Sequence, residues 1–144
     1  MKNTPKKYKV FLDTSVILSG LNSSFGASAA IISLFKTNQV EIIISREVIE
    51  EMQRVVNKKF PLLLGSYFDF LTTKPKIIPK PSLRDLKRAS LIIRSEDTPI
   101  LAGAIKSNAD FLITLDKKFG KILEHKKLRF QTVTPAEFLQ IYRK

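Results

Sequence analysis

Four carboxylates occupy places in the sequence where a ligand site would need them: Asp13, Glu51, Asp97 and Asp116. Asp13 ends the apolar run "YKVFL", where a charge is costly to bury unless it caps the next helix or binds a ligand. Asp116 follows the apolar run "FLIT" after one residue, and Glu51 lies in the second turn of the helix expected after "VEIII". Asp97 begins the helix expected before "FLIT". Four distant places in the chain therefore supply acids beside strand ends and helix starts.

Converging carboxylates repel one another and raise one another's pKa unless a cation neutralises them. Oxygen must hold that cation, because the chain has no Cys and only one His, which excludes thiolate and histidine-rich zinc sites. Mg²⁺ and Mn²⁺ prefer carboxylate and water oxygens. Acids that hold such a metal inside a basic protein suit the hydrolysis of phosphodiester bonds.

Short β-rich runs that alternate with helical patterns must position these acids. Residues 8–12, 40–44, 111–114 and 130–133 predict strands, and the middle two are apolar enough to be buried on both faces. Residues 76–78 lie between prolines and predict an edge strand or no strand. The alternation predicts a single-domain α/β/α sandwich over residues 1–144, with a central parallel sheet of four to five strands and right-handed crossovers.

The expected helices begin at recognisable caps. Ser45 is the expected N-cap of one helix, and capping boxes are expected at Ser82 with Asp85 and at Thr134 with Glu137. Helices are predicted over residues 27–37, 46–57, 62–71, 82–93 and 98–106, and a last helix opens with "TPAE", which has Pro135 in its first turn. Ligands of an open parallel sheet bind at the carboxyl edge of its strands, and a helix that precedes a strand starts at that edge. The four acids are therefore expected on one rim.

The charge balance of the chain indicates its partner. Twenty-five Lys and Arg against thirteen Asp and Glu give a formal charge of +12, which attracts polyanions and makes nucleic acid the leading partner class. No segment approaches the ~18 consecutive apolar residues of a membrane span. The basic start lacks the long apolar run and the cleavage site of a signal peptide. We expect a mature N-terminus, a cytoplasmic location and no membrane partner.

Four segments together resemble the PIN domain family, nucleases that include the VapC-type toxins of prokaryotic toxin-antitoxin pairs. They are "VFLDTSVILSGL", "IISREVIEEMQRVV", "SEDTPILAGAIKSNADFLITLDKKF" and "TPAEF", and the similarity runs from about Tyr8 to Tyr142. Each segment alone is weak, but their order and spacing are specific. The resemblance implies a Mg²⁺- or Mn²⁺-dependent endoribonuclease whose catalytic, metal-binding acids stand at Asp13, Glu51, Asp97 and Asp116.

The resemblance also implies supporting residues and partners. Thr14, Ser15 and Thr114 are expected to hydrogen-bond the acids from behind, a role that commonly matters at metal sites. The family more often has Asn at the position of Ser15, so this chain departs from the pattern there. A toxin would act on RNA and bind an antitoxin protein, and a homodimer is the default expectation because many relatives are dimers. RNA processing is an alternative role, and so is a catalytically weak scaffold that binds RNA or protein.

Each acid also has a purely structural interpretation. Asp13, Asp97 and Asp116 can each be the N-cap of the helix that follows. Glu51 has Glu47 and Glu50 as its neighbours, either of which is the alternative for its role, and an acid near a helix start is usually a solvated group that favours the helix dipole.

Other polar residues are expected to play smaller parts. Glu96 is interpreted as a solvated neighbour, Asp110 as part of a turn, and His125 as a surface residue with no triad partner. Lys117, Lys118 and Lys121 stand beside the predicted site and are the expected phosphate contacts, whereas Arg84, Lys87 and Arg88 form a basic helix face that can be merely solvated.

Two other families that begin with an aspartate after the first strand fit less well. A haloacid-dehalogenase-type phosphatase needs a second aspartate two residues later, where this chain has Ser15. A receiver domain needs paired acids early in the chain and a lysine after its last strand, and the acids here lie elsewhere.

Overall fold

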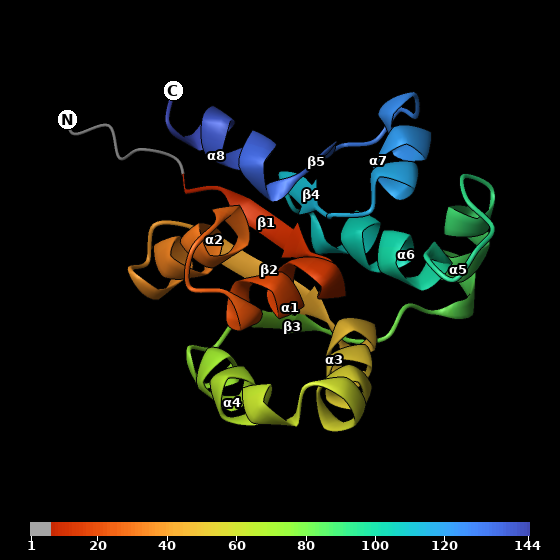
Figure 1. Cartoon of the computed structure of the whole chain (residues 1–144). Coiled ribbons are helices and arrows are strands. Elements are labelled where there is room, and N and C mark those ends of the chain that lie inside the picture. The colour runs from red at the N-terminus through yellow and green to blue at the C-terminus, as the bar shows by residue number, and fades with distance from the viewer. Residues whose placement is uncertain (1–6) are drawn as a thin grey trace.

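A parallel sheet of five strands organises the part of the chain that the computed structural model describes, residues 7–144. The strands are β1 (Lys9–Leu12), β2 (Glu41–Ser45), β3 (Lys76–Ile78), β4 (Phe111–Ile113) and β5 (Gln131–Val133). They lie in the order β3-β2-β1-β4-β5, so the first strand is at the centre of the sheet (Figure 1). The next two strands extend the sheet to one edge, and the last two extend it to the other. The register pairs Phe11 with Ile43 on one side and with Leu112 on the other.

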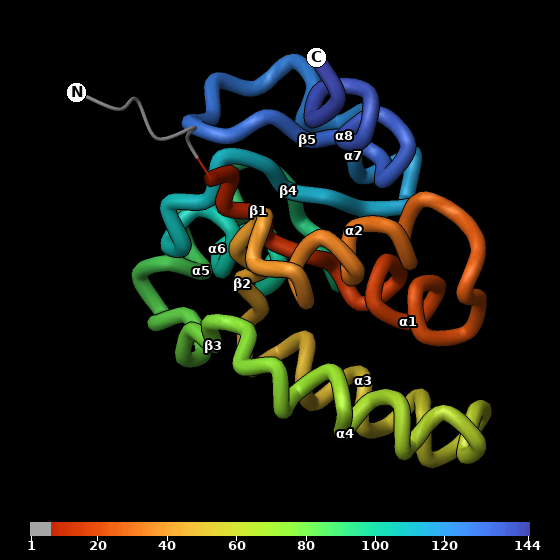
Figure 2. The backbone as a smooth tube through the Cα atoms, turned by 90° about the vertical axis from the view of Figure 1, so that its left-hand side faces the viewer, coloured from red at the N-terminus to blue at the C-terminus, as the bar shows by residue number. Residues whose placement is uncertain are grey.

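Eight α-helices flank this sheet within the described residues, which gives the predicted α/β/α fold. They are α1 (Thr14–Asn22), α2 (Ala27–Lys36), α3 (Arg46–Lys59), α4 (Leu64–Thr72), α5 (Leu83–Ser90), α6 (Thr98–Ser107), α7 (Lys117–Glu124) and α8 (Pro135–Tyr142). Figure 2 shows α1 and α2 on one side of β1 and α5 and α6 on the other. The helices α3 and α4 extend past the β3 edge, where the Tyr67 hydroxyl donates to the Ile49 carbonyl at 3.4 Å.

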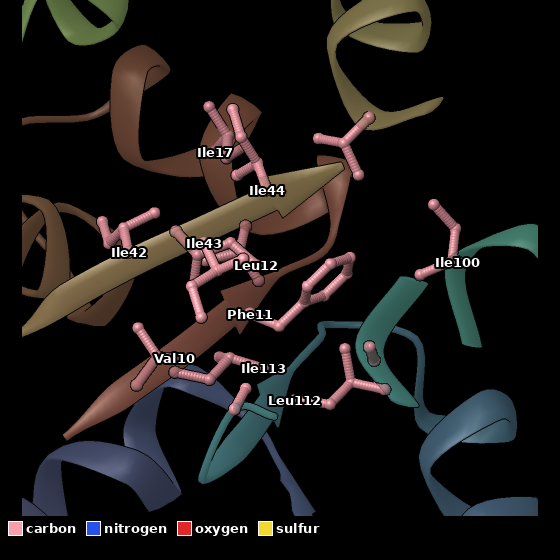
Figure 3. Packing of buried hydrophobic residues seen from close by; sticks show 14 of the residues in the cluster. Val10, Phe11, Leu12, Ile17, Ile42, Ile43, Ile44, Ile100, Leu112 and Ile113 are labelled. Atoms are coloured by element: carbon pink, nitrogen blue, oxygen red, sulfur yellow. The ribbon is translucent and has the colours of Figure 1, made fainter. Parts of the chain in front are cut away.

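The core lies on both faces of the central strands. Val10, Phe11 and Leu12 are fully buried, and β2 and β4 are buried along almost their whole length. Figure 3 shows Phe11 on the α6 side of the sheet, toward Ile100. There α6 packs closely, because a Cβ on Gly103 would meet the Phe11 ring at 3.3 Å. The close packing of Gly103 against Phe11 positions α6, and with it Asp97 at the start of that helix.

The predicted elements are confirmed, with small changes at their ends. Residues 76–78 form the edge strand β3, paired with β2 on one side only. The helix predicted over residues 62–71 begins as a short 3-10 turn at Pro61–Leu63 and continues as α4. The helix predicted over residues 82–93 is shorter, ending at Ser90. The expected mature N-terminus lies outside the described residues, because residues 1–6 are not among them.

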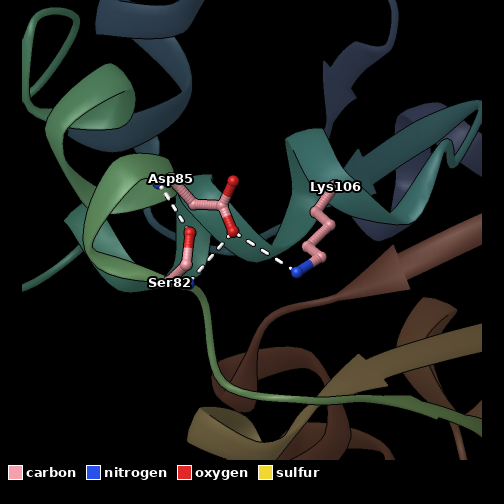
Figure 4. A network of polar contacts seen from close by, with 3 residues as sticks. All are labelled: Ser82, Asp85 and Lys106. Atoms are coloured by element: carbon pink, nitrogen blue, oxygen red, sulfur yellow. Dashed lines mark hydrogen bonds and ion pairs between the residues drawn. The ribbon is translucent and has the colours of Figure 1, made fainter.

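The predicted caps are present and hold the helices at the sheet. The Ser45 hydroxyl accepts a hydrogen bond from the Val48 amide at 3.3 Å, at the start of α3. At the start of α5, Ser82 and Asp85 form the predicted capping box, and Lys106 of α6 reaches the same Asp85 carboxylate at 3.4 Å (Figure 4). The second box joins Thr134 and Glu137 at the start of α8.

Among the described helices, none is by itself long and apolar enough to cross a membrane. Only α1 and α2 taken together meet that test, and the chain bends by 91° between them.

Candidate metal centre

Asp13 lies at the carboxyl end of the central strand β1, in the position that the sequence predicts. Its side chain is only 9% exposed. One carboxylate oxygen accepts a hydrogen bond from the Thr14 amide, and the other accepts one from the Thr114 hydroxyl, both at 2.7 Å. Burial raises the pKa of Asp13 above its ordinary value and the charge of Asp116 adds to the rise, while these hydrogen bonds oppose it. Asp13 therefore caps α1 and still has lone pairs for another ligand.

Thr114 connects two of the acids. Its hydroxyl donates to Asp13 and accepts a hydrogen bond from the backbone amide of Asp116 at 3.1 Å. Asp116 is exposed and caps α7, because its carboxylate accepts from the Phe119 amide at 3.1 Å. The hydroxyl of this buried threonine thus fixes Asp13 and the start of the Asp116 turn relative to each other, as strands β1 and β4 are paired directly beneath them.

Glu51 reaches the same rim from α3. Burial raises the pKa of the half-buried Glu51 side chain first, and the charge of Asp13 raises it further. Its neighbour Glu50 instead forms an ion pair with Lys80, with a nitrogen to oxygen distance of 3.0 Å. The pKa of Glu51 therefore responds to the charge of Asp13, whereas the carboxylate of Glu50 is engaged by Lys80.

Asp97 approaches the rim from the start of α6. It occupies the N-cap position, yet its carboxylate makes no capping hydrogen bond. Burial raises its pKa, and the charges of Asp13, Asp116, Glu96 and Glu51 raise it further, in that order. Asp97 therefore interacts electrostatically with each of the other three predicted acids, and its carboxylate is not used for capping.

Glu96 is exposed, as expected of a solvated neighbour, but its charge contributes to the raised pKa of both Glu51 and Asp97. The sequence interpretation did not include this contribution, because the spacing of "SED" does not show which other acids lie near Glu96.

The hydroxyl groups of Thr14 and Ser15 make different contacts near the acids. Thr14 is buried, and its hydroxyl makes no hydrogen bond of normal geometry among the described residues, although it lies near enough to Glu51 to lower the pKa of that carboxyl. The Ser15 hydroxyl accepts from the Leu115 amide at 3.3 Å and reaches Asp13 only at 3.5 Å, the long limit of a hydrogen bond. Ser15 therefore holds the turn before Asp116 more firmly than it holds Asp13.

The residues at this rim fit a hard divalent cation by their chemistry. The donors are carboxylate oxygens: burial is the main cause of the raised pKa values of Asp13, Glu51 and Asp97, repulsion by neighbouring acids adds to it, and a cation would relieve both. Within residues 7–144, no three His, Cys, Asp or Glu side chains stand close enough to hold one ion as a group. An ion there would accordingly keep several waters, as Mg²⁺ usually does in proteins.

The basic residues beside the acids separate into two groups. Lys117 and Lys121 line a groove that begins at Asp116, and Lys118 does not. The groove also includes Lys126 and Arg129, which the sequence interpretation left out because they follow α7 in an irregular segment with no helical pattern. The basic residues Arg84, Lys87 and Arg88 lie on α5, and none of them lines this groove.

Comparisons with known proteins agree with this architecture. VapBC2 from Rickettsia felis, solved bound to a DNA fragment from their promoter, is similar with 25% sequence identity and a TM-score of 0.60. The match covers 88% of this chain and 98% of that one. PAE2754 from Pyrobaculum aerophilum is similar with 14% identity and a TM-score of 0.65, over 95% of this chain and 91% of that one, which supports the fold alone.

No curated protein matches this chain. The PIN domain family model matches residues 9–118, the segment that contains all four predicted acids. PIN domains are in general nucleases. Because that match spans well over half of the sequence, the chain belongs to the PIN domain family.

Proposed function

We propose that this protein is a metal-dependent endoribonuclease that hydrolyses RNA phosphodiester bonds. One observation carries the proposal: Asp97 lies within the electrostatic reach of Asp13, Glu51 and Asp116, although the four acids come from different elements. Retaining mutually repelling carboxylates on one rim is costly unless they bind a cation. The chain around them carries a net charge of +12, which would hold the polyanion that bare acids repel.

In this proposal, Asp13 and Asp97 hold the principal Mg²⁺ or Mn²⁺, and Glu51 and Asp116 complete the acidic site, partly through water. A divalent metal bound there would activate water and stabilise the negative charge that develops on the phosphate. The Thr14 amide and the Thr114 hydroxyl keep the Asp13 carboxylate in one orientation. The exposed Lys117 and Lys121 would bind phosphates next to the cleaved bond.

The biological role that we propose is that of a toxin in a toxin-antitoxin pair. It is supported by the similarity to VapBC2, which covers nearly all of that chain. The proposal brings with it an antitoxin protein as partner, a homodimer as the default assembly and a cytoplasmic site of action. Co-purification with the product of the neighbouring gene would test the antitoxin, and the mass of the purified protein in solution would test the dimer.

A second candidate is a PIN domain of low activity that acts as a binding scaffold. The observation that favours it is the long contact of 3.5 Å between Ser15 and Asp13, at a position where the family more often has Asn. The four retained acids favour the nuclease over this alternative.

A cleavage assay separates the two functions. Purified protein is incubated with a panel of single-stranded and structured RNAs in Mg²⁺, in Mn²⁺ and in chelator. The nuclease proposal predicts cleavage that requires metal and stops with chelator. RNA that is bound but never cut, under all metal conditions, would favour the scaffold.

A further inference from the structure

An open groove of about 940 Å³ runs from the acid rim along α7 and the edge strand β5. Thr114 and Asp116 line it at the acid rim, Arg129 lines it in the segment that leads into β5, and Gln131 is the first residue of β5. Its volume is at the upper end of the ~300–1,000 Å³ that is typical of ligand clefts. The groove is therefore continuous with the proposed catalytic site.

The face of α7 that lines the groove carries cations at helical spacing. Lys117, Lys121 and Glu124 line it, at intervals of four and three residues, so they share one face of the helix. Lys126 and Arg129 extend the row past the end of α7. Beyond Asp116, four cations therefore line the groove against two acids, Glu124 and Glu137.

These cations are available to a ligand. Lys117, Lys121, Lys126 and Arg129 are all exposed. In the part of the chain that the structure describes, ion pairs join Lys80 to Glu50 and Lys106 to Asp85, and neither involves the groove. Arg129 donates to the Asn108 side chain at 3.2 Å. The Glu137 carboxylate, by contrast, already accepts from the Thr134 amide at 2.8 Å within its capping box, so it competes less for the lysines.

A smaller hollow that shares Lys117 and Thr134 with the groove supplies an exposed aromatic ring. It has a volume of about 320 Å³ and is lined by Phe25, Leu115 and Lys117 among others. The Phe25 side chain is 87% exposed, although it is large and apolar. A positively charged groove beside an exposed aromatic ring is the arrangement that binds a single nucleic acid strand, with phosphates on the cations and unpaired bases stacked on the ring.

We propose that this groove binds the single-stranded segment of the RNA that flanks the cleaved bond, with Lys121, Lys126 and Arg129 on its phosphates and one unpaired base on Phe25. The proposal rests on the proposed function, since it places the cleaved bond at the acid rim. A single strand fits better than a duplex because the bases of a duplex are stacked within it and cannot reach Phe25.

The test compares two double variants that lose the same charge. Lys126→Gln with Arg129→Gln removes two groove cations that lie away from the acids, and Lys87→Gln with Arg88→Gln removes two exposed cations from α5. Both pairs change the net charge equally, so long-range attraction of RNA falls equally in both. Each pair is made in the parent chain for kinetics and in the Asp13→Asn background for binding, so that cleavage does not disturb the binding measurement.

Binding is measured by fluorescence anisotropy with a labelled single-stranded RNA of about 12 nucleotides, as a function of salt. We expect the groove pair to bind roughly tenfold more weakly, with a log–log salt slope smaller by about 1.4, since each phosphate contact on a single strand contributes about 0.7. Phe25→Ala should weaken binding by a further several-fold, and a duplex of the same sequence should compete poorly. The proposal would be overturned if the groove pair and the α5 pair lost the same affinity for RNA, or if the duplex bound as tightly as the single strand.

Kinetics separate the groove from the nuclease itself. The reference substrate is bis-para-nitrophenyl phosphate, a phosphodiester too small to extend along the groove. We expect the groove pair to raise KM for RNA far more than it affects hydrolysis of this ester in Mn²⁺. If the groove pair lowered kcat/KM for RNA and for the ester by the same factor, the variants would be disturbing the acid rim. That result would refute the proposed role of the groove in RNA binding. If the parent protein cut neither substrate, the proposed function would fail, and the binding comparison would still decide whether the groove holds RNA.

Discussion

At the scale of single residues, Asp13 shows how this chain retains a carboxylate at the end of a buried strand. The Thr14 amide and the Thr114 hydroxyl donate to its two oxygens, and these hydrogen bonds offset part of the cost of burial. The sequence indicated Asp13 because a charge interrupts an apolar run. Thr114 was expected to support the acids only because of the resemblance to the PIN family. Local patterns do not show this contact, because it depends on the pairing of β1 with β4.

Replacing Thr114 by Val tests the connecting hydroxyl. The side chain keeps its shape but no longer donates to Asp13 or accepts from the Asp116 amide. We expect RNA cleavage or apparent metal affinity to fall by roughly 10- to 100-fold, as is typical when the partners of metal ligands are lost. Measuring the rate against Mn²⁺ concentration separates the two effects. Thr72→Val, which alters an exposed threonine on α4, is the control, and equal rates in the two variants would contradict the role of Thr114.

The raised pKa values predict how stability depends on pH without metal. A carboxyl group whose pKa is higher in the folded chain stabilises the fold at low pH, and this contribution is lost as pH rises through the folded pKa. Asp13, Glu51 and Asp97 all have pKa values raised in this direction. In chelator, Asp13→Asn should therefore gain stability relative to the parent chain as pH rises from about 4 to about 7. If the denaturation midpoints of the variant and the parent chain changed equally with pH over that range, the ionisation of Asp13 would not destabilise the fold.

At the scale of helices and strands, the alternation of patterns and the caps predicted most of the fold. The strands, the edge position of residues 76–78 and both capping boxes are confirmed. The end of α5 was predicted three residues too late, because the apolar "LII" that follows Ser90 continues the helical pattern while the chain turns. Local periodicity does not contain the tertiary contacts that end a helix.

Ser45 connects a helix start to the site. It is fully buried at the end of β2, and its hydroxyl caps α3, the helix that carries Glu51. Ser45→Ala should cost about 1 kcal/mol of unfolding free energy, the usual value for an N-cap. RNA cleavage at a temperature where the variant is fully folded should also decrease, since the first turns of α3 position Glu51. Denaturation and kinetics on the same sample measure both effects, and Ser82→Ala, which uncaps the more distant α5, provides the comparison. Equal kinetic effects in the two variants would argue against this link.

At the scale of the whole molecule, few acids in a strongly basic chain converge on one rim. The sequence predicted this convergence from topology alone, since both strand ends and preceding helix starts lie at the carboxyl edge. The groove was not predictable in the same way. Lys126 and Arg129 follow α7 in an irregular segment, so no periodic pattern relates them to Lys117 and Lys121.

Metal binding should raise the stability of the whole molecule. An ion that binds only the folded chain stabilises it by about 2.7 kcal/mol when its concentration is ~100 times the Kd. We expect Mn²⁺ to raise the Tm above the value in chelator, and Asp13→Asn to lose most of that rise. A rise of the same size in Asp13→Asn would place the metal elsewhere.

The central claim is that the acid rim around Asp13 cuts RNA, and one comparison tests it most directly. The rate of RNA cleavage in Mn²⁺ is measured for Asp13→Asn and for Asp69→Asn, which removes the same charge from an exposed position on α4. We predict that Asp13→Asn loses at least roughly 100-fold in rate, that Asp69→Asn matches the parent, and that both variants keep the fold. If Asp13→Asn cut RNA as fast as Asp69→Asn, the rim would not be the catalytic site.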